Sequence, residues 1–258
     1  MKFLRGVHPE TKRPFYGQID GDRVLGLLHE PYDGLALSGE QFSLDEITLL
    51  APCDPGKIVA GGANYRSHLL ELGLAIPKAP VFFLKAPSSL TGPDSAVDYP
   101  DQTKRLEFEA ELAIVVGKKI YKATPEQARN AIFGYTIVND VTARDIQFKD
   151  NSLMHMPHAK SFDTFCPCGP WIETDIADPG NLEFQTTVNG GRLQVNNTND
   201  MIFSIPDMLS YFSHIMTLNP GDLVATGTPT TSAGLSVGDT VSITFDRIGT
   251  LTNTVRRL

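Results

Sequence analysis

The chain contains the stretch Leu106-Glu107-Phe108-Glu109-Ala110-Glu111-Leu112, which continues into the apolar residues Ala113-Ile114-Val115-Val116. Alternate side chains of an extended strand point to the same face, so we expect Glu109 and Glu111 to lie side by side. Two adjacent carboxylates repel each other unless a cation or a shared proton lies between them. A divalent ion such as Mg²⁺ would remove this repulsion. The alternative is an acidic, solvent-facing start of a strand, and the stretch by itself leaves both interpretations open.

Size and composition describe an ordinary globular protein. The chain has 258 residues, 41% of them hydrophobic and 20% charged, which suits one large domain or two modest ones. The formal net charge of −8 argues against nucleic acid or an anionic membrane as a partner. A small carboxylate substrate remains compatible with this charge if a local cation attracts it.

The sequence predicts neither a secretory signal nor a membrane-spanning helix. No long apolar segment follows Met1, and no apolar run approaches the roughly 20 residues of a membrane-spanning helix. The odd number of three cysteines, Cys53, Cys166 and Cys168, favours reduced thiols. We therefore predict a cytoplasmic protein. Cys166-Pro167-Cys168 could indicate metal or redox chemistry, but in the absence of a second such pair we expect it to serve packing.

The first part of the chain is typical of a small β unit. Asp20-Gly21-Asp22 separates two apolar segments and predicts a hairpin. The turn-forming residues 51–56 indicate a boundary, which predicts a small N-terminal β domain over residues 1–52 and a catalytic domain over residues 53–258.

The remainder predicts strands interrupted by three short helices. The first helix covers residues 65–72, with Asn64 as N-cap and Gly73 as its stop. The second begins at the capping box Thr124-Pro125-Glu126-Gln127. The third begins at Ser204-Ile205-Pro206, and its residues Met208, Leu209, Phe212 and Ile215 share one face.

Two segments predict strands in this part. Residues 132–138 predict a buried strand. Near the C-terminal end, Val241, Ile243 and Phe245 alternate with polar residues and predict a second strand with one apolar face. Strands and helices do not alternate regularly, so the fold class is α+β, mostly β, with a mixed sheet.

Two polar constellations are candidates for proton transfer and charge stabilisation. His68 and Glu71 are three residues apart on the first helix, a spacing that lets a carboxylate orient a general base, although a surface ion pair is the alternative. Asp140 follows an apolar strand and is a candidate oxygen ligand. Arg144 and Gln147 are donors suited to a carboxylate or an enolate, although the segment also fits a simple turn.

Two further segments contribute polar groups. Lys160 is a point cation that suits an oxyanion, and it follows His155 and His158 in a segment that we expect to be a mobile polar loop. The turn Gly227-Thr228-Pro229 offers N–H groups and a hydroxyl to a carboxylate.

Together these segments resemble the short form of the fumarylacetoacetate hydrolase family. The resemblance extends from about Lys57 to Asp246. The sequence around Lys160 is most similar to that of members labelled 2-hydroxyhepta-2,4-diene-1,7-dioate isomerases. It rests on five motifs in order: Asn64-Tyr65-Arg66-Ser67-His68, Phe108-Glu109-Ala110-Glu111-Leu112, Asn139-Asp140-Val141-Thr142-Ala143-Arg144-Asp145, Lys160-Ser161-Phe162-Asp163-Thr164-Phe165, and Pro220-Gly221-Asp222 with Thr226-Gly227-Thr228-Pro229. After the last motif, residues 230–234 replace a shorter Gly-Val-Gly run of many members.

The resemblance implies a mixed β-roll with few helices, usually a homodimer, that binds one Mg²⁺ (or Mn²⁺). It assigns Glu109, Glu111 and Asp140 to the metal, and His68 with Glu71 to a water-activating pair. Lys160 would stabilise negative charge near Arg144 and Gln147. Thr228 would bind the substrate carboxylate.

From these roles we expect a metal-dependent enzyme, with a place in aromatic catabolism, that acts on a 2-oxo acid or 1,3-dicarbonyl carboxylate. A metal-bound enolate would lead to C–C hydrolysis, isomerisation or decarboxylation. Two other classes compete with this hypothesis. A metal-dependent nuclease would need a basic surface, which the charge of −8 disfavours. A catalytically silent binder of 2-oxo acids would use the same pocket.

Overall fold

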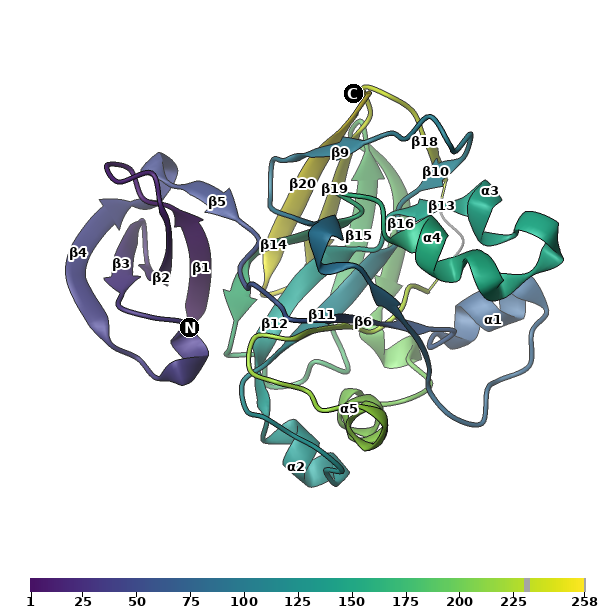
Figure 1. The fold of residues 1–258 in the computed structure, drawn as a ribbon, viewed down its shortest axis with the longest axis horizontal. Helices are drawn as coiled ribbons and strands as arrows, with labels where there is room; N and C mark the ends of the chain where they lie inside the picture. The colour runs from purple at the N-terminus through teal and green to yellow at the C-terminus, as the bar shows by residue number, and fades with distance from the viewer. Residues whose placement is uncertain (230–232, 258) are drawn as a thin grey trace.

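The computed structural model describes residues 1–229 and 233–257. The N-terminal strands form a separate lobe, drawn in purple in Figure 1. They are β1 (Lys2–Val7), β2 (Pro14–Asp20), β3 (Arg23–Leu27), β4 (Leu37–Ser43) and β5 (Thr48–Leu50). The predicted hairpin is confirmed, since β2 pairs with β3 up to Asp20↔Arg23 and Gly21 takes the left-handed conformation that the turn requires, with φ 64°.

One large sheet extends from this lobe through the rest of the molecule. In the described part of the chain it has 12 strands, in the order β4-β3-β2-β1-β14-β12-β11-β17-β6-β7, with β5 on β1 and β8 on β14. Its further strands are β6 (Ile58–Gly62), β7 (Val81–Lys85), β8 (Leu90–Thr91), β11 (Ala110–Val116), β12 (Ile132–Asn139), β14 (Cys166–Glu173) and β17 (Leu223–Ala225). Strand β1 of the first predicted domain pairs with β14 of the second, so the large sheet continues across both domains. The boundary at residue 52 therefore stays a prediction.

Two smaller sheets complete the fold. A 5-stranded sheet has the order β16-β15-β19-β20-β9, and a 3-stranded one the order β13-β10-β18, among the described residues. Their strands are β9 (Ala96–Asp98), β10 (Leu106–Glu107), β13 (Thr142–Ala143), β15 (Glu183–Val188), β16 (Gly191–Asn197), β18 (Gly234–Leu235), β19 (Thr240–Phe245) and β20 (Gly249–Arg256). The predicted alternation in β19 is confirmed: its apolar side chains are buried, while Ser242 bonds Thr252 across the strands at 2.9 Å.

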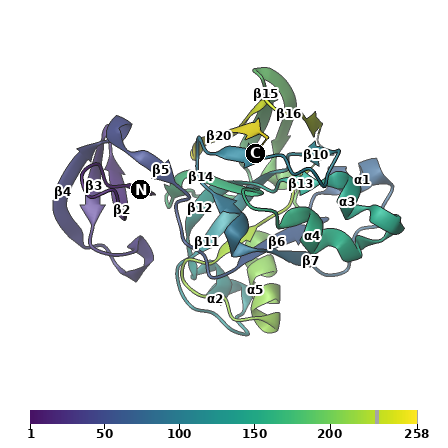
Figure 2. The same cartoon turned by 45° about the horizontal axis from the view of Figure 1, so that its top comes forward.

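The helices lie in two groups at the edges of the sheets. In Figures 1 and 2, α2 and α5 lie together on one side, and α1, α3 and α4 gather beside β6 and β7. The α-helices are α1 (Arg66–Leu72), α2 (Pro125–Arg129), α3 (Arg144–Gln147), α4 (Met156–Lys160) and α5 (Ile205–Ile215). Short 3₁₀ turns are η1 (Pro31–Asp33), η2 (Leu44–Glu46), η3 (Pro87–Ser89), η4 (Lys149–Asn151), η5 (Leu153–His155) and η6 (Thr198–Asp200).

The helix starts that rest on capping patterns are largely confirmed. Thr124 and Gln127 form the predicted capping box at α2, and the Ser204 side chain caps α5. Gly73 ends α1 with φ 65°. Ile215, however, is 51% exposed, so the predicted apolar face of α5 is shorter by one residue.

Three local predictions are wrong. Tyr65 is the N-cap of α1, because the Asn64 side chain bonds Phe203 N at 2.8 Å and Thr226 O at 3.1 Å instead. The segment expected to be a mobile polar loop contains α4, in which Pro157 occupies a first-turn position that suits its missing N–H. The described chain therefore has more α-helices than the three predicted, since α3 and α4 were missed.

Strand β11 is buried on both faces, and this determines where its carboxylates lie. Leu112 and Ile114 enter one hydrophobic cluster, and Ala113 and Val115 enter a second cluster on the opposite face. By alternation along the strand, Glu111 shares the face of Ala113 and Val115. A carboxylate at this position is enclosed by protein, which excludes the alternative of a solvent-facing acidic strand.

Candidate metal centre and polar pocket

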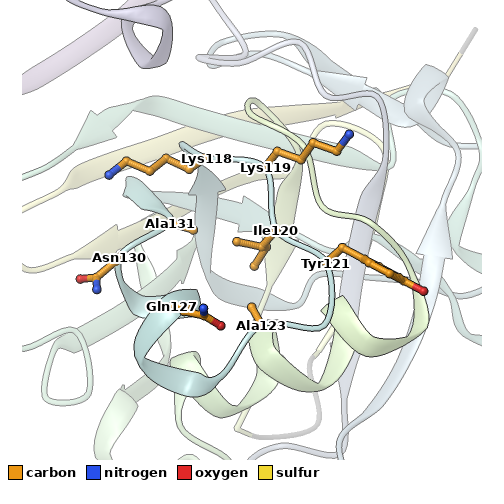
Figure 3. A pocket seen from close by; sticks show the side chains of 8 residues that line it. All are labelled: Lys118, Lys119, Ile120, Tyr121, Ala123, Gln127, Asn130 and Ala131. Atoms are coloured by element: carbon orange, nitrogen blue, oxygen red, sulfur yellow. The ribbon is translucent and has the colours of Figure 1, made fainter.

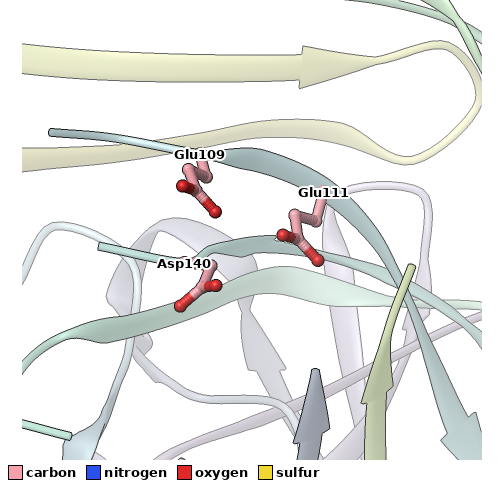
Figure 4. Close-up of side chains that lie close together, drawn as sticks. All are labelled: Glu109, Glu111 and Asp140. Atoms are coloured by element: carbon pink, nitrogen blue, oxygen red, sulfur yellow. The ribbon is translucent and has the colours of Figure 1, made fainter. Parts of the chain in front are cut away.

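Three buried carboxylates converge at the start of β11. Glu109, Glu111 and Asp140 each offer an oxygen within 4.8 Å of the others, and their side chains point toward a common space (Figure 4). Asp140 directly follows β12, and its N–H donates to Glu109 O at 2.9 Å. Pairing of β11 with β12 therefore fixes the positions of all three residues.

Two lysine ammonium groups hold Asp140 from opposite sides. Lys160 Nζ donates to Asp140 Oδ2 at 2.5 Å and to Glu109 Oε2 at 2.7 Å. Lys85 Nζ donates to Asp140 Oδ1 and to Lys160 O, both at 2.5 Å. Burial opposes the charge of Lys160, but Asp140 and Glu109 outweigh it and raise the pKa of Lys160 above its ordinary value. Both lysines are therefore internal counter-ions of the acidic group.

Arg144 connects the acidic group to helix α3. Its Nη2 donates to Glu109 Oε1 at 2.6 Å, its Nε donates to Glu107 Oε2 at 2.7 Å, and its Nη1 bonds Gln147 Oε1. Burial alone would raise the pKa of Glu109, but Lys160 and Arg144 lower it to about 2. Glu109 is therefore ionised at neutral pH.

Glu111 lacks the cationic support of its neighbours. It accepts a hydrogen bond from Gly227 N at 2.7 Å, and no lysine or arginine bonds to it within the described residues. Gly227 has φ +95°, and a Cβ there would lie 3.3 Å from Gly61 O, which explains a glycine at this point. Burial, with repulsion from Asp140 and Glu109, raises the pKa of Glu111 well above its ordinary value.

This donor set fits a hard divalent cation. Mg²⁺ and Mn²⁺ prefer carboxylate oxygens, and three such groups from separate segments lie close enough to share one ion. Burial and repulsion from Asp140 and Glu109 raise the pKa of Glu111, and a cation bound between the carboxylates would offset both effects.

His68 lies at the border of the acidic group. It is half-buried on α1, and its Nδ1 is buried without a hydrogen-bond partner in the described chain. Burial lowers the pKa of His68, against the opposing effects of Glu109 and Glu71, while Arg144 and Lys160 lower it further. Glu109, Arg144 and Lys160 therefore all influence the charge state of His68.

Thr228 contributes a buried hydroxyl next to Gly227, the residue that bonds Glu111. It follows Gly227, whose N–H holds Glu111, and its Oγ1 has no hydrogen-bond partner among residues 1–229 and 233–257. An unpaired buried hydroxyl is costly unless a ligand bonds to it. The predicted difference at residues 230–234 falls partly on residues 230–232, which lie outside the described residues.

Sequence reasoning missed two charged residues of the site. Lys85 ends strand β7 and is fully buried, and the one signal in its sequence is a lysine that directly follows the apolar run Val81–Leu84. Glu107 is buried and bonds both Arg144 and Arg105, a role that its position two residues before Glu109 does not indicate. His155 and His158, in contrast, do not belong to the carboxylate group: His155 lies 3.7 Å from Asp150, and His158 packs on Phe162.

Other features of the described chain lie apart from this centre. A surface hollow of about 330 Å³ near α2 is lined by Ile120, Tyr121 and Gln127 (Figure 3), and none of its residues belongs to the carboxylate group. The three cysteines are free and buried, as predicted. No helix in the described part of the chain has the length and apolar character needed to cross a membrane.

Comparison with known families gives two matches that together span most of the chain. The profile "Fumarylacetoacetate (FAA) hydrolase C-terminal" matches residues 57–256, and the profile "Rv2993c-like, N-terminal" matches residues 1–52. Among curated proteins, Protein Rv2993c of Mycobacterium tuberculosis is 44% identical over 251 residues, which are 94% of each chain. Oxaloacetate tautomerase fahd2 of Xenopus laevis is 40% identical over 83% of this chain and 70% of its own length.

Solved structures similar to this chain match it over nearly its full length. A 5-carboxymethyl-2-hydroxymuconate delta-isomerase from Mycobacterium smegmatis has a TM-score of 0.91 and 38% identity, with all of both chains covered. A 2-hydroxyhepta-2,4-diene-1,7-dioate isomerase from Mycobacterium marinum has a TM-score of 0.90 and 38% identity, over 100% of this chain and 98% of its own. Maleylpyruvate hydrolase from Sphingobium, solved with manganese and pyruvate, has a TM-score of 0.81 and 28% identity, over 100% of this chain and 99% of its own.

Proposed function

Because the chain belongs to the fumarylacetoacetate hydrolase family, we propose that it is a Mg²⁺- or Mn²⁺-dependent enzyme that enolises a 2-oxo acid with a second carboxylate. The observation that carries this proposal is the convergence of three buried carboxylates beside a buried lysine and a histidine with an unpartnered Nδ1. Such an arrangement supplies both a cation site and a base, which enolisation needs.

Glu109, Glu111 and Asp140 would hold the metal. When bound, the ion supplies Lewis-acid stabilisation of negative charge on substrate oxygens. A neighbour of known structure was solved with manganese and pyruvate, which supports a 2-oxo acid as the ligand class. Lys160, which bonds two of the three carboxylates, adds a fixed positive charge beside them.

Polar groups on two further segments would orient the substrate. Thr228 Oγ1 is buried without a partner in the described chain, so it is available to a substrate carboxylate. Arg144 is held by Glu107 and Glu109 and bonds Gln147, which fixes its guanidinium beside the carboxylate group. Prepositioned donors of this kind lower the entropic cost of orienting the substrate.

His68 is the group that moves the proton. Its Nδ1 takes a proton from C3 of the 2-oxo acid, the C–H electron pair forms the C2=C3 bond, and the carbonyl π pair moves to oxygen. The ammonium of Lys160 stabilises the charge on that oxygen. Return of the proton to oxygen gives the enol, and its return to a distant carbon of a conjugated substrate gives an isomer. Glu71 supports the base because its charge raises the pKa of His68.

Names of similar proteins favour proton transfer over C–C cleavage. Two relatives, from Xenopus laevis and Bacillus subtilis, are oxaloacetate tautomerases, at 40% and 41% identity. Two structural neighbours are isomerases of hydroxylated dienedioates. Hydrolysis and decarboxylation remain alternatives that share the enolisation step, as does a silent binder of 2-oxo acids. The homodimer, the cytoplasmic location and the role in aromatic catabolism stay predictions.

A substrate panel with purified protein tests the proposal. We expect keto–enol exchange of oxaloacetate, or isomerisation of a hydroxylated dienedioate, with Mg²⁺ or Mn²⁺, and loss of turnover with a chelator. Acylpyruvates test hydrolysis in the same assay, and pyruvate release from oxaloacetate tests decarboxylation. If 2-oxo acids raise the melting temperature but none is converted, the protein is the silent binder and the proposal fails.

The pH dependence follows from the base role of His68. The neutral imidazole accepts the proton, and burial lowers the pKa of His68 below its ordinary 6.5. Activity is lost as pH falls through that pKa, so kcat/KM should rise with pH and reach half of its plateau at a pH below 6.5. His68→Asn should lower kcat by about 10²- to 10⁴-fold and remove this acidic limb from the residual rate. An unchanged acidic limb in that variant contradicts the assignment.

A further inference from the structure

Ser67, which precedes His68 in the chain, joins three segments through its backbone N–H and its hydroxyl. Ser67 lies on α1, and its N–H donates to Asp200 Oδ2 at 2.9 Å. Its hydroxyl is 2.6 Å from the same carboxylate oxygen and 2.8 Å from Pro229 O. Asp200 ends η6, and Pro229 is buried in the turn after β17. The contact therefore connects α1 to two parts of the chain more than 130 residues away.

One hydroxyl proton serves two acceptors in this arrangement. A serine hydroxyl donates a single hydrogen bond, so the bonds from Ser67 to Asp200 and to Pro229 compete. The backbone N–H of Ser67 bonds Asp200 in either case, so α1 keeps one attachment while the hydroxyl turns to Pro229. The hydroxyl is thus a link between α1 and the Thr228-Pro229 turn.

Helix α1 depends on such polar contacts for its orientation. Leu69 is its one fully buried residue, while Leu70 and Leu72 are exposed by 74% and 45%. A helix with so few apolar contacts opens easily unless its ends are held. At the start of α1, Tyr65 forms an isolated bridge with Met201, and Ile202 N donates to Asn64 O at 2.8 Å. The segment around Asp200 therefore holds the start of α1 in place.

We propose that Ser67 is a positioning residue, which sets the separation between His68 and Thr228 through its hydroxyl. His68 follows Ser67 in the chain, and Thr228 precedes Pro229. The first is the proton-moving group and the second the carboxylate-binding group of the proposed function, on which this inference rests. A substrate fixed at one end by Thr228 presents C3 to His68 only when that separation is correct.

The kinetic test compares Ser67→Ala with Ser67→Thr. Loss of the hydroxyl in Ser67→Ala should lower kcat and raise KM, with kcat/KM falling about 10- to 100-fold. Ser67→Thr keeps the hydroxyl and should stay within about threefold of wild type. Wild-type kcat and KM in Ser67→Ala would overturn the proposal.

Ser204→Ala is the matched control for a serine with a purely structural role. The Ser204 side chain caps α5, where it accepts from Asp207 N at 3.3 Å, and it takes no part in the site. This variant should lower the melting temperature, as loss of an N-cap does, and leave kcat and KM unchanged. If Ser204→Ala reproduces the kinetic loss of Ser67→Ala, general destabilisation explains both and the positioning role is wrong.

Hydrogen exchange separates failure of this inference from failure of the proposed function. Peptides covering residues 66–73 and 226–229 should both exchange faster in Ser67→Ala than in wild type, because the link holds both segments. This measurement needs no substrate, so it applies even if no 2-oxo acid is converted. Unchanged exchange in residues 226–229 would overturn the link, whereas faster exchange without any wild-type turnover would sink only the proposed function.

Discussion

The Glu111→Gln variant is expected to be more stable than the wild-type protein in the presence of a chelator, and yet inactive. Glu111 is buried, and burial together with Asp140 and Glu109 raises its pKa well above the ordinary 4.5. The folded carboxyl therefore binds a proton more tightly than the unfolded one, and its stability contribution is lost as pH rises from 4.5 through the raised pKa. Glutamine is neutral at every pH and still accepts from Gly227 N. The advantage of the variant should therefore grow as pH rises above 4.5 through the raised pKa, and reach about 1 kcal/mol, or roughly 2–4 °C in melting temperature.

The same substitution should abolish metal binding and turnover. An amide oxygen is a weaker ligand than a carboxylate, so Mg²⁺ or Mn²⁺ should no longer raise the melting temperature, and kcat/KM should fall by about a hundredfold or more. Asp145→Asn is the control, because Asp145 is an exposed carboxylate of the Asn139–Asp145 motif that accepts hydrogen bonds from Thr103 and from Lys104 N and does not belong to the carboxylate group. Metal-dependent stabilisation that persists in Glu111→Gln, or turnover at the wild-type rate, contradicts the assignment. Normal magnesium-dependent turnover by Asp140→Ala would contradict it equally.

Local patterns made much of this site predictable. The spacing of Glu109 and Glu111 places both carboxylates on one face of an extended segment, and the structure brings them together with Asp140. Apolar alternation in β19 and the capping box of α2 also depend on residues that are close in sequence. Such signals survive folding because each one involves a few consecutive side chains.

Residues that act across the chain were harder to find. Lys85 bonds Asp140 over a separation of 55 residues, and nothing near Lys85 in the sequence names its partner. Asn64 is a residue type that favours the N-cap position, but its side chain bonds Phe203 and Thr226 instead. These contacts depend on which strands become neighbours in the sheet, and one sequence does not fix that order.

Replacing Lys160 by methionine is expected to produce the second large effect, on both catalysis and stability. Lys160 Nζ bonds Glu109 Oε2 and Asp140 Oδ2, and its side chain is 2% exposed. Its removal leaves two buried carboxylates without this cation, which should cost about 3–5 kcal/mol of unfolding free energy in a chelator. At saturating Mg²⁺ or Mn²⁺, kcat should fall by about 10²- to 10³-fold, because charge on the substrate oxygen loses its fixed ammonium.

The Lys85→Met variant separates the contribution of a buried lysine to stability from its contribution to catalysis. Lys85 is equally buried and bonds the other oxygen of Asp140, so its loss should reduce stability by a similar amount, measured by denaturant unfolding. Its second close partner is the carbonyl of Lys160, so its contacts hold the protein and not the substrate. Once the metal site is saturated, kcat should therefore fall about tenfold, far less than in Lys160→Met. An equal loss of kcat in both variants would mean that the ammonium of Lys160 has no special place in the chemistry, and that burial of either charge merely keeps Asp140 in position.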